Sequence, residues 1–454
     1  MIAETQVPES YLEQFDQRRS WAEPEWLARL RQESFGLFTE AGFPTTHDED
    51  WRFTNITPIS RSEFQSPPQV RLEPAALESF RISEFVCRLV FVNGRFAPEL
   101  CRFPALPQGV ILGSLAEQIA TNPSLVEQHL GKHLNVKRDV FAALNTAFFE
   151  DGAFIYVPRN TVLLHPVYVL FVSAGADAAV AEHPRSLIIA EENSQTSVVE
   201  DYVTLDDGSA STFSNTATEL IAGSGAVASH FMLVRQGQRS FNVSTLRIQQ
   251  ERSSNVSTHS FLLSSSLVRN NVHPVLNGGG AECLINGLFM AGSGQHMDNY
   301  MLVEHAAPHC NSRQFYNGIL NGSGHGVFHG RIIVHKDAQK TDAKQTNRNL
   351  LLSDNAQIDT KPQLEIYADD VKCTHGATIG QVDESALFYL RARGLDEASA
   401  RHLLLLAFAN ECLDRIASHS VRSHLERLVM ASLPEKAEDG GAQPLPERAW
   451  EEVG

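Results

Sequence analysis

The segment Val371–Ile379 carries the residues whose types and spacing best suit metal chemistry. If it forms a strand, alternation places Cys373 and His375 on one face, about 7 Å apart. A thiolate and an imidazole suit soft and borderline metals such as iron or zinc. Two ligands cannot complete a tetrahedral site, so a metal bound here would need ligands from a second surface. Burial of both residues in an apolar core is the alternative. Gly376 weighs slightly against it, because a residue without a side chain permits close approach of another backbone.

A second candidate is the run His305-x-x-x-His309-Cys310, which has the spacing of a metal site on a helix. Pro308 and the flanking strand pattern argue against a helix here. On a strand, His305 and His309 would share a face, while Cys310 would point away from it. A packing role is therefore favoured over metal binding.

Three more histidines, His325, His329 and His335, occupy odd positions in the run Gly324–Lys336. On one strand their side chains would line up on a single face. Imidazoles can titrate near neutral pH, so the row could have a chemical role. A solvated or hydrogen-bonded ladder on a long sheet is the simpler interpretation.

The sequence holds no nucleotide-binding or hydrolase motif. The glycine-rich stretches Gly278–Gly280 and Gly292–Gly294 lack the Gly-Lys-Ser/Thr ending of a phosphate-binding loop and lie between predicted strands. We expect them to be turns. A Gly-x-Ser-x-Gly nucleophile motif does not occur either. The chain is therefore not expected to bind or hydrolyse ATP.

The composition is that of a globular, acidic protein. Its 454 residues suggest roughly three domains. With 43% hydrophobic and 20% charged residues it can bury a sizeable core, which excludes wholesale disorder. The 37 Lys and Arg residues against 54 Asp and Glu give a net charge of −17, so the chain is not expected to bind nucleic acid or an anionic membrane.

Neither a membrane span nor a secretion signal is expected. The longest strongly apolar stretch, Leu403–Ala409, is far shorter than the ~20 residues that cross a bilayer. The first ten residues lack the basic and apolar regions of a signal peptide. The six cysteines are scattered and form no Cys-x-x-Cys pair. This pattern predicts a reduced, cytoplasmic protein without a disulfide framework or a self-contained zinc or cluster site.

The hydrophobic pattern divides the chain into four parts. Residues 1–150 have mostly helical spacing, with a short hairpin near 85–96. Residues 151–382 are short β-branched runs separated by Gly, Asn, Ser and Asp. Helical spacing returns over 383–433. The remainder, 434–454, is rich in proline, glycine and acidic residues and is expected to be a disordered tail.

Two local signals mark particular turns and ends. The β-branched run Leu89–Val92 leads directly into Asn93–Gly94, which predicts a tight hairpin. Asp396 precedes an apolar helical pattern and is a candidate N-cap.

The long β segment decides the fold class. A sandwich needs only about 100 residues for seven strands, so a continuous segment of 151–382 is long for one. A solenoid, in which each coil packs only on its neighbours, accommodates any length. No period is visible in the sequence. The predicted fold is mainly β, a parallel β-helix core flanked by N-terminal and C-terminal helical domains.

Motifs spread over nearly the whole chain make it similar to the SufB/SufD family of the SUF iron–sulfur cluster assembly system. Together they are specific, although no single one would suffice. They are Asp48–Asn55, Leu89–Phe96, Leu144–Phe148, Val303–His305, Lys340–Leu352, Pro362–Ile366, Asp370–Gly380 and Leu387–Gly394.

Two departures favour the SufD branch of this family. SufB-like chains carry a cysteine in a CDSLL-like run, where this chain has Arg348–Leu352 without a thiol. SufB-like chains also carry an acidic EHEAT-like stretch, where this chain has Cys373–Thr378.

The resemblance implies a right-handed β-helix that pairs with SufB through the helix ends, and C-terminal helices that bind a SufC ATPase. It implies that His375, with Cys373 beside it, is a ligand of a transient iron–sulfur cluster to which SufB adds a thiolate and an acid. The chain would be a non-enzymatic scaffold subunit that also relays ATP-driven movement of SufC through residues 385–432. The same end of the β-helix could form a homodimer in the absence of SufB. Whether the complex binds flavin stays open.

Two other functions stay open on the sequence alone. A β-helix polysaccharide lyase or hydrolase would need acids and bases gathered in a groove along the solenoid, and is usually secreted. A purely structural partner of SufB would keep Cys373 and His375 buried and inert.

Overall fold

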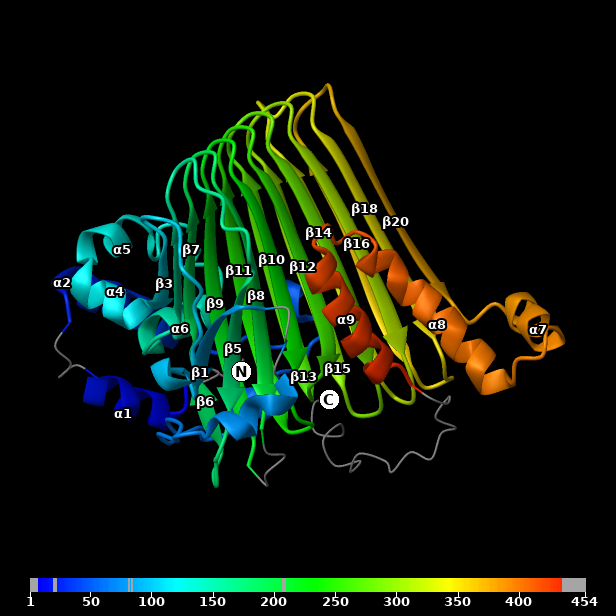
Figure 1. Ribbon diagram of the computed structural model, residues 1–454, viewed down its shortest axis with the longest axis horizontal. Coiled ribbons are helices and arrows are strands. Elements are labelled where there is room, and N and C mark those ends of the chain that lie inside the picture. The colour runs from blue at the N-terminus through cyan, green and yellow to red at the C-terminus, as the bar shows by residue number, and fades with distance from the viewer. Residues whose placement is uncertain (1–6, 19–22, 81, 83–84, 206–209, 435–454) are drawn as a thin grey trace.

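The computed structural model describes residues 7–18, 23–80, 82, 85–205 and 210–434. Its body is a β-solenoid in which the chain passes alternately between two long sheets, with helices towards both ends of the sequence (Figure 1). The predicted fold class, a mainly β protein with a β-helix core between helical segments, is confirmed. The tail predicted over 434–454 lies, apart from Pro434, outside the described residues.

We name the two sheets after their C-terminal strands. The β20 sheet runs in the order β2 (Arg95–Phe96), β1 (Cys87–Val92), β5 (Val167–Ser173), β8 (Gln195–Thr204), β10 (Val227–Arg235), β12 (Asn255–Ser264), β14 (Glu282–Ala291), β16 (Asn311–Leu320), β18 (Asp342–Leu351), β20 (Lys372–Gly380). The β19 sheet runs in the order β19 (Gln357–Ile366), β17 (His325–Val334), β15 (His296–His305), β13 (Leu267–Leu276), β11 (Ser240–Gln250), β9 (Thr212–Ala222), β7 (Arg185–Ala190), β4 (Ala153–Val157), β3 (Ile111–Ser114), and β6 (Val180–Glu182) also pairs with β9.

Successive turns of the solenoid stack in register. Gln314 of β16 lies beside Gln345 of β18, for example, and Gln345 lies beside His375 of β20. Because side chains alternate between the two faces of a strand, every second residue points into the solenoid. The inward side chains of both sheets form one apolar core, in which Phe289 and Phe328 are fully buried. Each such side chain contributes roughly 1.5–3 kcal/mol through its burial.

The N-terminal edge of the β20 sheet is closed by the predicted hairpin. Strands β1 and β2 pair antiparallel, with Phe91 opposite Phe96. Asn93 and Gly94 form the two-residue turn, with φ of 51° and 74°. Positive φ at both positions is what this type of hairpin turn requires, and Asn-Gly is the pair that adopts it at low cost.

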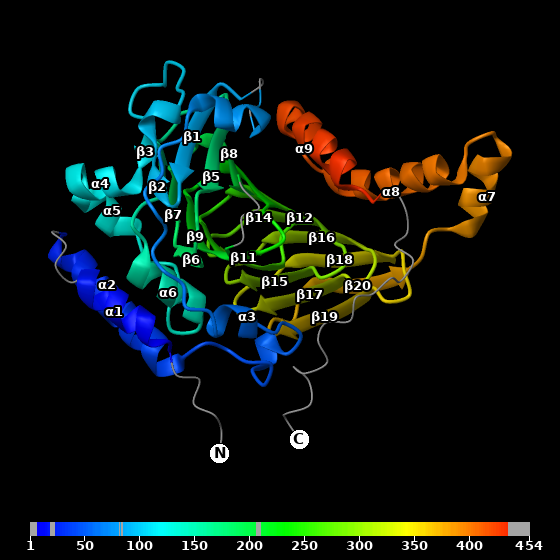
Figure 2. The same cartoon turned by 90° about the horizontal axis from the view of Figure 1, so that it is seen from below.

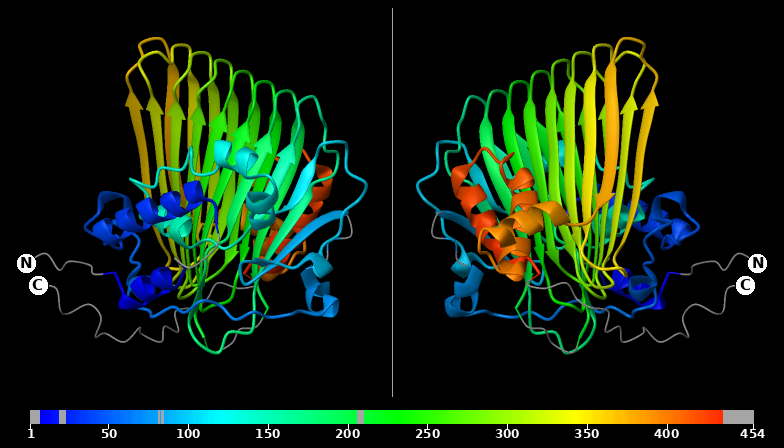
Figure 3. Two further views of the ribbon diagram at one scale, coloured as in Figure 1. Left: turned by 90° about the vertical axis from the view of Figure 1, so that its left-hand side faces the viewer. Right: turned by 90° about the vertical axis from the view of Figure 1, so that its right-hand side faces the viewer.

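The N-terminal helices pack on the outer face of the β19 sheet, near the strands at its N-terminal end (Figure 3). At this contact, α6 inserts Asn145, whose Nδ2 donates to the backbone oxygens of Pro184 and Asn215 at 2.9 Å. Beside it, Arg185 and Glu219 form a fully buried ion pair of 2.6 Å. The elements before the solenoid are α1 (Glu9–Arg18), α2 (Glu25–Ala41), η1 (Glu49–Trp51), α3 (Thr57–Ser60), η2 (Pro74–Phe80), η3 (Pro98–Leu100), α4 (Leu115–Thr121), α5 (Pro123–His129) and α6 (Val140–Phe148).

The C-terminal helices are α7 (Glu384–Ala392), α8 (Glu397–Leu413) and α9 (His419–Ser432). They lie against the outer face of the β20 sheet, except for α7 and the first turns of α8, which form an arm that projects away from the sheet (Figure 2). The side chain of Asp396 accepts a hydrogen bond from the backbone N–H of Ser399, which confirms it as the N-cap of α8. Within the described residues, none of the helices is both long enough and apolar enough to cross a bilayer.

Two fully buried histidines are held neutral by the packing. Burial lowers the pKa of His305 to about 4 and that of His259 to about 3. His305 points into the solenoid, where its Nε2 lies 2.8 Å from the Ser312 hydroxyl. His259 lies on the outer face of the β20 sheet, stacked on Phe231. In the unfolded chain the pKa of both imidazoles returns to about 6.5.

This difference predicts a loss of stability in mild acid. As the pH falls from about 6.5 to about 4, the unfolded chain takes up a proton that folded His305 excludes, so the free energy of unfolding decreases. Below about pH 4 the folded chain takes up the same proton, and His305 causes no further decrease. Each histidine of this kind contributes a slope of up to about 1.4 kcal/mol per pH unit. His305→Gln should therefore lose less stability than the wild type between neutral pH and pH ~5 in urea unfolding. Identical losses of stability in His305→Gln and in the wild type over this pH range would contradict the prediction.

Candidate functional site

The C-terminal end of the solenoid is open. Strands β19 and β20 are the last strands of their sheets, so each pairs on one side only with another strand of the described residues (Figure 2). Large apolar side chains are exposed here: Tyr367 is 62% exposed, Ile379 52% and Ile366 41%. Unpaired strand edges with exposed apolar groups are templates for association with another chain. This end is therefore the first place to look for a shared site.

Both predicted metal ligands lie on the open strand β20. Their register neighbours on β18 are Ala343 for Cys373 and Gln345 for His375, and both neighbours are buried inside the solenoid. Cys373 and His375 thus belong to the inward-facing set, as the strand alternation predicts. Because β20 is the last turn, His375 is nevertheless exposed to solvent. The alternative in which both residues are buried in a core does not hold for His375.

The free backbone groups of β20 belong to these same residues. The N–H of Lys372 donates to the Thr341 oxygen on the β18 side. In a parallel strand the N–H and C=O of a residue point to the same side, and the direction alternates from residue to residue. The backbone groups of Cys373 and His375 therefore face the open edge. A second chain that paired with this edge would come within reach of the His375 imidazole.

The two ligand candidates differ in how ready they are to bind metal. Cys373 is half-buried against the apolar core, and burial raises the pKa of its thiol, so it is protonated at neutral pH. A thiol binds metal only after it loses that proton. Of the two candidates, His375 is therefore the accessible one, and Cys373 could join it only if a metal displaced the proton. Within the described residues, no group of three or more His, Cys, Asp or Glu side chains is arranged to hold a metal ion.

The structure does not bring the residues of the second candidate together. His305 points into the solenoid and bonds to Ser312, whereas His309 lies in the following turn with a φ of 60° and is exposed. The strand β15 ends at His305, so the prediction that both histidines share a strand face was wrong. Cys310 is buried, with its thiol 3.3 Å from the Gly278 oxygen. Packing therefore explains His305 and Cys310, whereas His309 is an exposed turn residue.

The histidine row of β17 is a hydrogen-bonded ladder, as the simpler interpretation predicted. His325 bonds to Asp359 at 2.8 Å, and its Nδ1 lies 3.1 Å from Nδ1 of His296. His329 bonds to Gln363 at 2.7 Å. His335, just past the strand, lies 3.2 Å from Glu304.

The N-terminal motif Asp48–Asn55 covers part of this ladder, a contact that no local sequence signal showed. Trp51 stacks on the Arg269 guanidinium at 4.4 Å, and Thr54 bonds to His296 at 3.0 Å. Glu49 forms a 2.7 Å ion pair with Lys361 on the last strand, β19. The N-terminal segment therefore reaches the open end.

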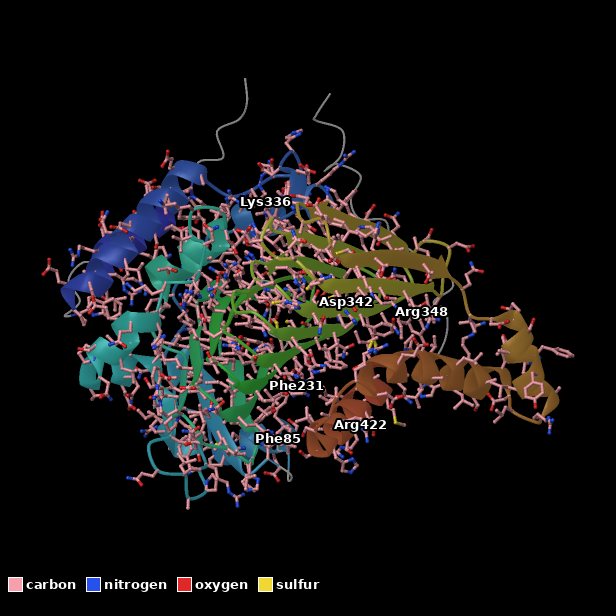
Figure 4. The ribbon with its side chains drawn as sticks, turned by 90° about the horizontal axis from the view of Figure 1, so that it is seen from above. Phe85, Phe231, Lys336, Asp342, Arg348 and Arg422 are labelled. Carbon is pink, nitrogen blue, oxygen red and sulfur yellow. The ribbon has the colours of Figure 1, made fainter. Side chains whose placement is uncertain are left out.

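The C-terminal helices reach the same end from the other sheet. Asn317 donates from Nδ2 to the Phe408 backbone oxygen of α8 at 2.9 Å. Arg348 of β18 forms an ion pair with Glu411 and lies between the sheet and α8 (Figure 4). Arg348 is also the register neighbour of Thr378 on β20. Helix α8 thus contacts the sheet at β18, the strand next to the open edge strand β20.

Comparison with known proteins gives one consistent result. The protein-family model described as "SUF system FeS cluster assembly, SufBD core domain" matches residues 171–408. The family model of the SufBD protein N-terminal region matches residues 5–169. An iron–sulfur cluster assembly SufBD family protein of Synechocystis is 33% identical over 90% of this chain and 92% of its own length. The iron–sulfur cluster assembly protein SufD of Escherichia coli is 30% identical over 91% and 93%. SufD of Bacillus subtilis is 25% identical over 93% and 97%.

Proposed function

Because the chain belongs to the SufBD family of iron–sulfur cluster assembly proteins and is SufD-like, we propose that it is a non-enzymatic scaffold subunit. It presents His375, with Cys373 beside it, to a nascent cluster that a SufB-type partner helps to hold. The observation that carries this proposal is the exposed imidazole on an unpaired edge strand. The cluster is the cargo of the assembly and not a resident cofactor of this chain.

The open end of the solenoid supports pairing with SufB through the ends of the two helices. The outward backbone groups of β19 and β20 can continue each sheet into a second chain by strand addition. Exposed Tyr367, Ile379 and Ile366 would be buried in the same event. The same edge could pair with a second copy of this chain when SufB is absent.

Chemical complementarity supports a shared site. His375 supplies one neutral imidazole nitrogen, and the Cys373 thiol can add a thiolate only after losing its proton. Iron in clusters prefers thiolates, and replacing one by imidazole changes the charge and potential of the cluster. A partner that adds a thiolate and a carboxylate would complete the coordination that this chain lacks.

The projecting arm supports docking of a SufC-type ATPase. On α7, Phe388 is 74% exposed and Tyr389 57%, and Leu403 of α8 is 46% exposed. Aromatic side chains exposed together on a helix are typical anchors of protein interfaces. ATP hydrolysis is then the work of SufC, and movement of SufC would reach the solenoid through α8, which is fastened to β16 and β18.

The proposal is tested first at His375. In the complex reconstituted with SufB and SufC under anaerobic conditions, His375→Ala should lower the iron and sulfide retained per complex by roughly tenfold or more, because one ligand is lost. His335→Ala, another exposed histidine, is the matched control. Retention at the wild-type level in His375→Ala, with the complex intact, would show that this chain is only a structural partner.

The open edge is tested by adding a charge to it. Ile379→Lys should leave the free energy of unfolding of the isolated chain nearly unchanged, because the side chain is already half-exposed. It should weaken association with SufB by about tenfold or more in dissociation constant, or about 1.4 kcal/mol, because a lysine would be buried without a partner. Leu164→Lys is the matched control, since Leu164 is 82% exposed and lies away from the open end. Equal affinities of the two variants, measured by titration calorimetry, would exclude this edge as the interface.

The arm is tested with Phe388→Ala. An exposed aromatic anchor typically contributes about 2 kcal/mol or more to binding, so the variant should lose most of its affinity for SufC. Phe103→Ala removes another exposed phenylalanine, 43% exposed and in the N-terminal part of the chain, and should bind normally. Undiminished SufC binding by Phe388→Ala would place the docking surface elsewhere.

A further inference from the structure

Behind His375, inside the solenoid, lies a buried pair of side-chain amides. Gln314, Gln345 and His375 occupy the same inward position on three successive strands, β16, β18 and β20. The Nε2 group of Gln345 donates to Oε1 of Gln314 at 2.8 Å. Gln314 is 2% exposed and Gln345 1%, so both amides are removed from water.

Among the described residues, both outer ends of this amide pair lack a hydrogen-bond partner: Nε2 of Gln314 on one side and Oε1 of Gln345 on the other. Oε1 of Gln345 is buried and accepts no hydrogen bond within the described residues. Strands β16 and β20 flank β18 on opposite sides. Because the nitrogen of the planar amide is directed to Gln314 on β16, its oxygen lies on the side of β20, where the next inward residue is His375. A buried acceptor left without a donor costs about 1–3 kcal/mol. The next inward residue along the column, His375, carries a ring N–H of the kind that this oxygen lacks.

A glycine on the opposite sheet makes the space for this amide. A Cβ built on Gly330 of β17 would lie only 1.8 Å from Nε2 of Gln345 and 2.7 Å from its Cδ. The backbone of Gly330 is not in the left-handed region, so its conformation does not require glycine. The missing side chain therefore leaves the space that the Gln345 amide occupies, and a Cβ at this position would displace the amide.

We propose that Gln345 is a positioning residue for His375. The hydrogen bond between them is not formed in the structure, where the Gln345 amide oxygen has no partner among the described residues. A rotation of the exposed imidazole brings one ring N–H to this oxygen and so selects a single tautomer of the ring. A neutral imidazole has one N–H and one bare nitrogen. With the N–H held inside the solenoid, the bare nitrogen is directed to the open end, where it can bind iron. Hydrogen bonding of the second ring nitrogen is the usual way in which proteins orient a metal-binding histidine.

The inference rests on the proposed function of His375 but is tested without it. In the isolated, metal-free chain labelled with ¹⁵N-histidine, two-bond proton–nitrogen spectra report which ring nitrogen carries the proton. The resonances of His375 are identified by their loss in His375→Ala. In the wild type at a pH where the ring is neutral, one tautomer should dominate. In Gln345→Met, which keeps the length of the side chain but removes the acceptor, the two tautomers should become mixed.

Two further variants make the test specific. Gly330→Ala leaves Gln345 in place but pushes its amide away, so it should mix the tautomers as Gln345→Met does. Asn347→Leu is the matched control: it removes another buried amide from the same face of β18, but its register neighbour on β20 is Ala377, which has no ring to orient. It should leave His375 unchanged.

Wild-type tautomer populations in both Gln345→Met and Gly330→Ala would overturn the inference, and so would mixed tautomers in the wild type. Iron and sulfide retention in the reconstituted complex is measured in parallel. If Gln345→Met mixes the tautomers while His375→Ala retains full cluster, the proposed function fails and the positioning role stands. If His375→Ala loses the cluster and no variant alters the tautomer, the positioning role fails and the proposed function stands.

Discussion

An unpaired strand edge is the constraint on which the rest of this structure depends. In a solenoid each turn satisfies its backbone hydrogen bonds with the turn before and the turn after, so the first and last turns lack one neighbour. At the N-terminal end, the antiparallel strands β2 and β3 continue the two sheets, and helices pack beside them. At the C-terminal end, β19 and β20 have no such continuation within the described residues. Of the helices that follow, α9 and the later turns of α8 lie on the outer face of the β20 sheet and α7 projects away from it, so the edge itself is left open (Figure 2).

Much of the fold followed from local patterns. The hairpin at Asn93–Gly94 and the cap at Asp396 each rest on a few adjacent residues, and both were predicted correctly. The repeat of the solenoid was not visible, because its turns differ in length. Strands β12, β14, β16, β18 and β20 begin at residues 255, 282, 311, 342 and 372, at intervals of 27, 29, 31 and 30. The strands keep their register through hydrogen bonds and not through a fixed spacing in the sequence.

The site, too, was predictable only where it depends on a local pattern. Alternation along one strand correctly grouped Cys373 with His375, but it failed for His305 and His309, because β15 ends between them. The exposure of His375 follows from its place on the last turn, which a local pattern does not contain. Gln345 and Gly330 are linked to His375 only through the register of strands about 30 residues apart and through the opposite sheet. No spacing within a single segment could have found them.

The position of the site on an edge also explains why its two ligand candidates differ. A residue that faces inward on the last turn has the packed core behind it and solvent ahead of it. The short Cys373 side chain stays close to the core, which keeps its thiol protonated, whereas the longer imidazole of His375 reaches solvent. Association of a second chain at this edge would remove water from both side chains and bring its own groups to them. Metal binding and strand pairing would then be coupled, since each would stabilise the arrangement that the other requires.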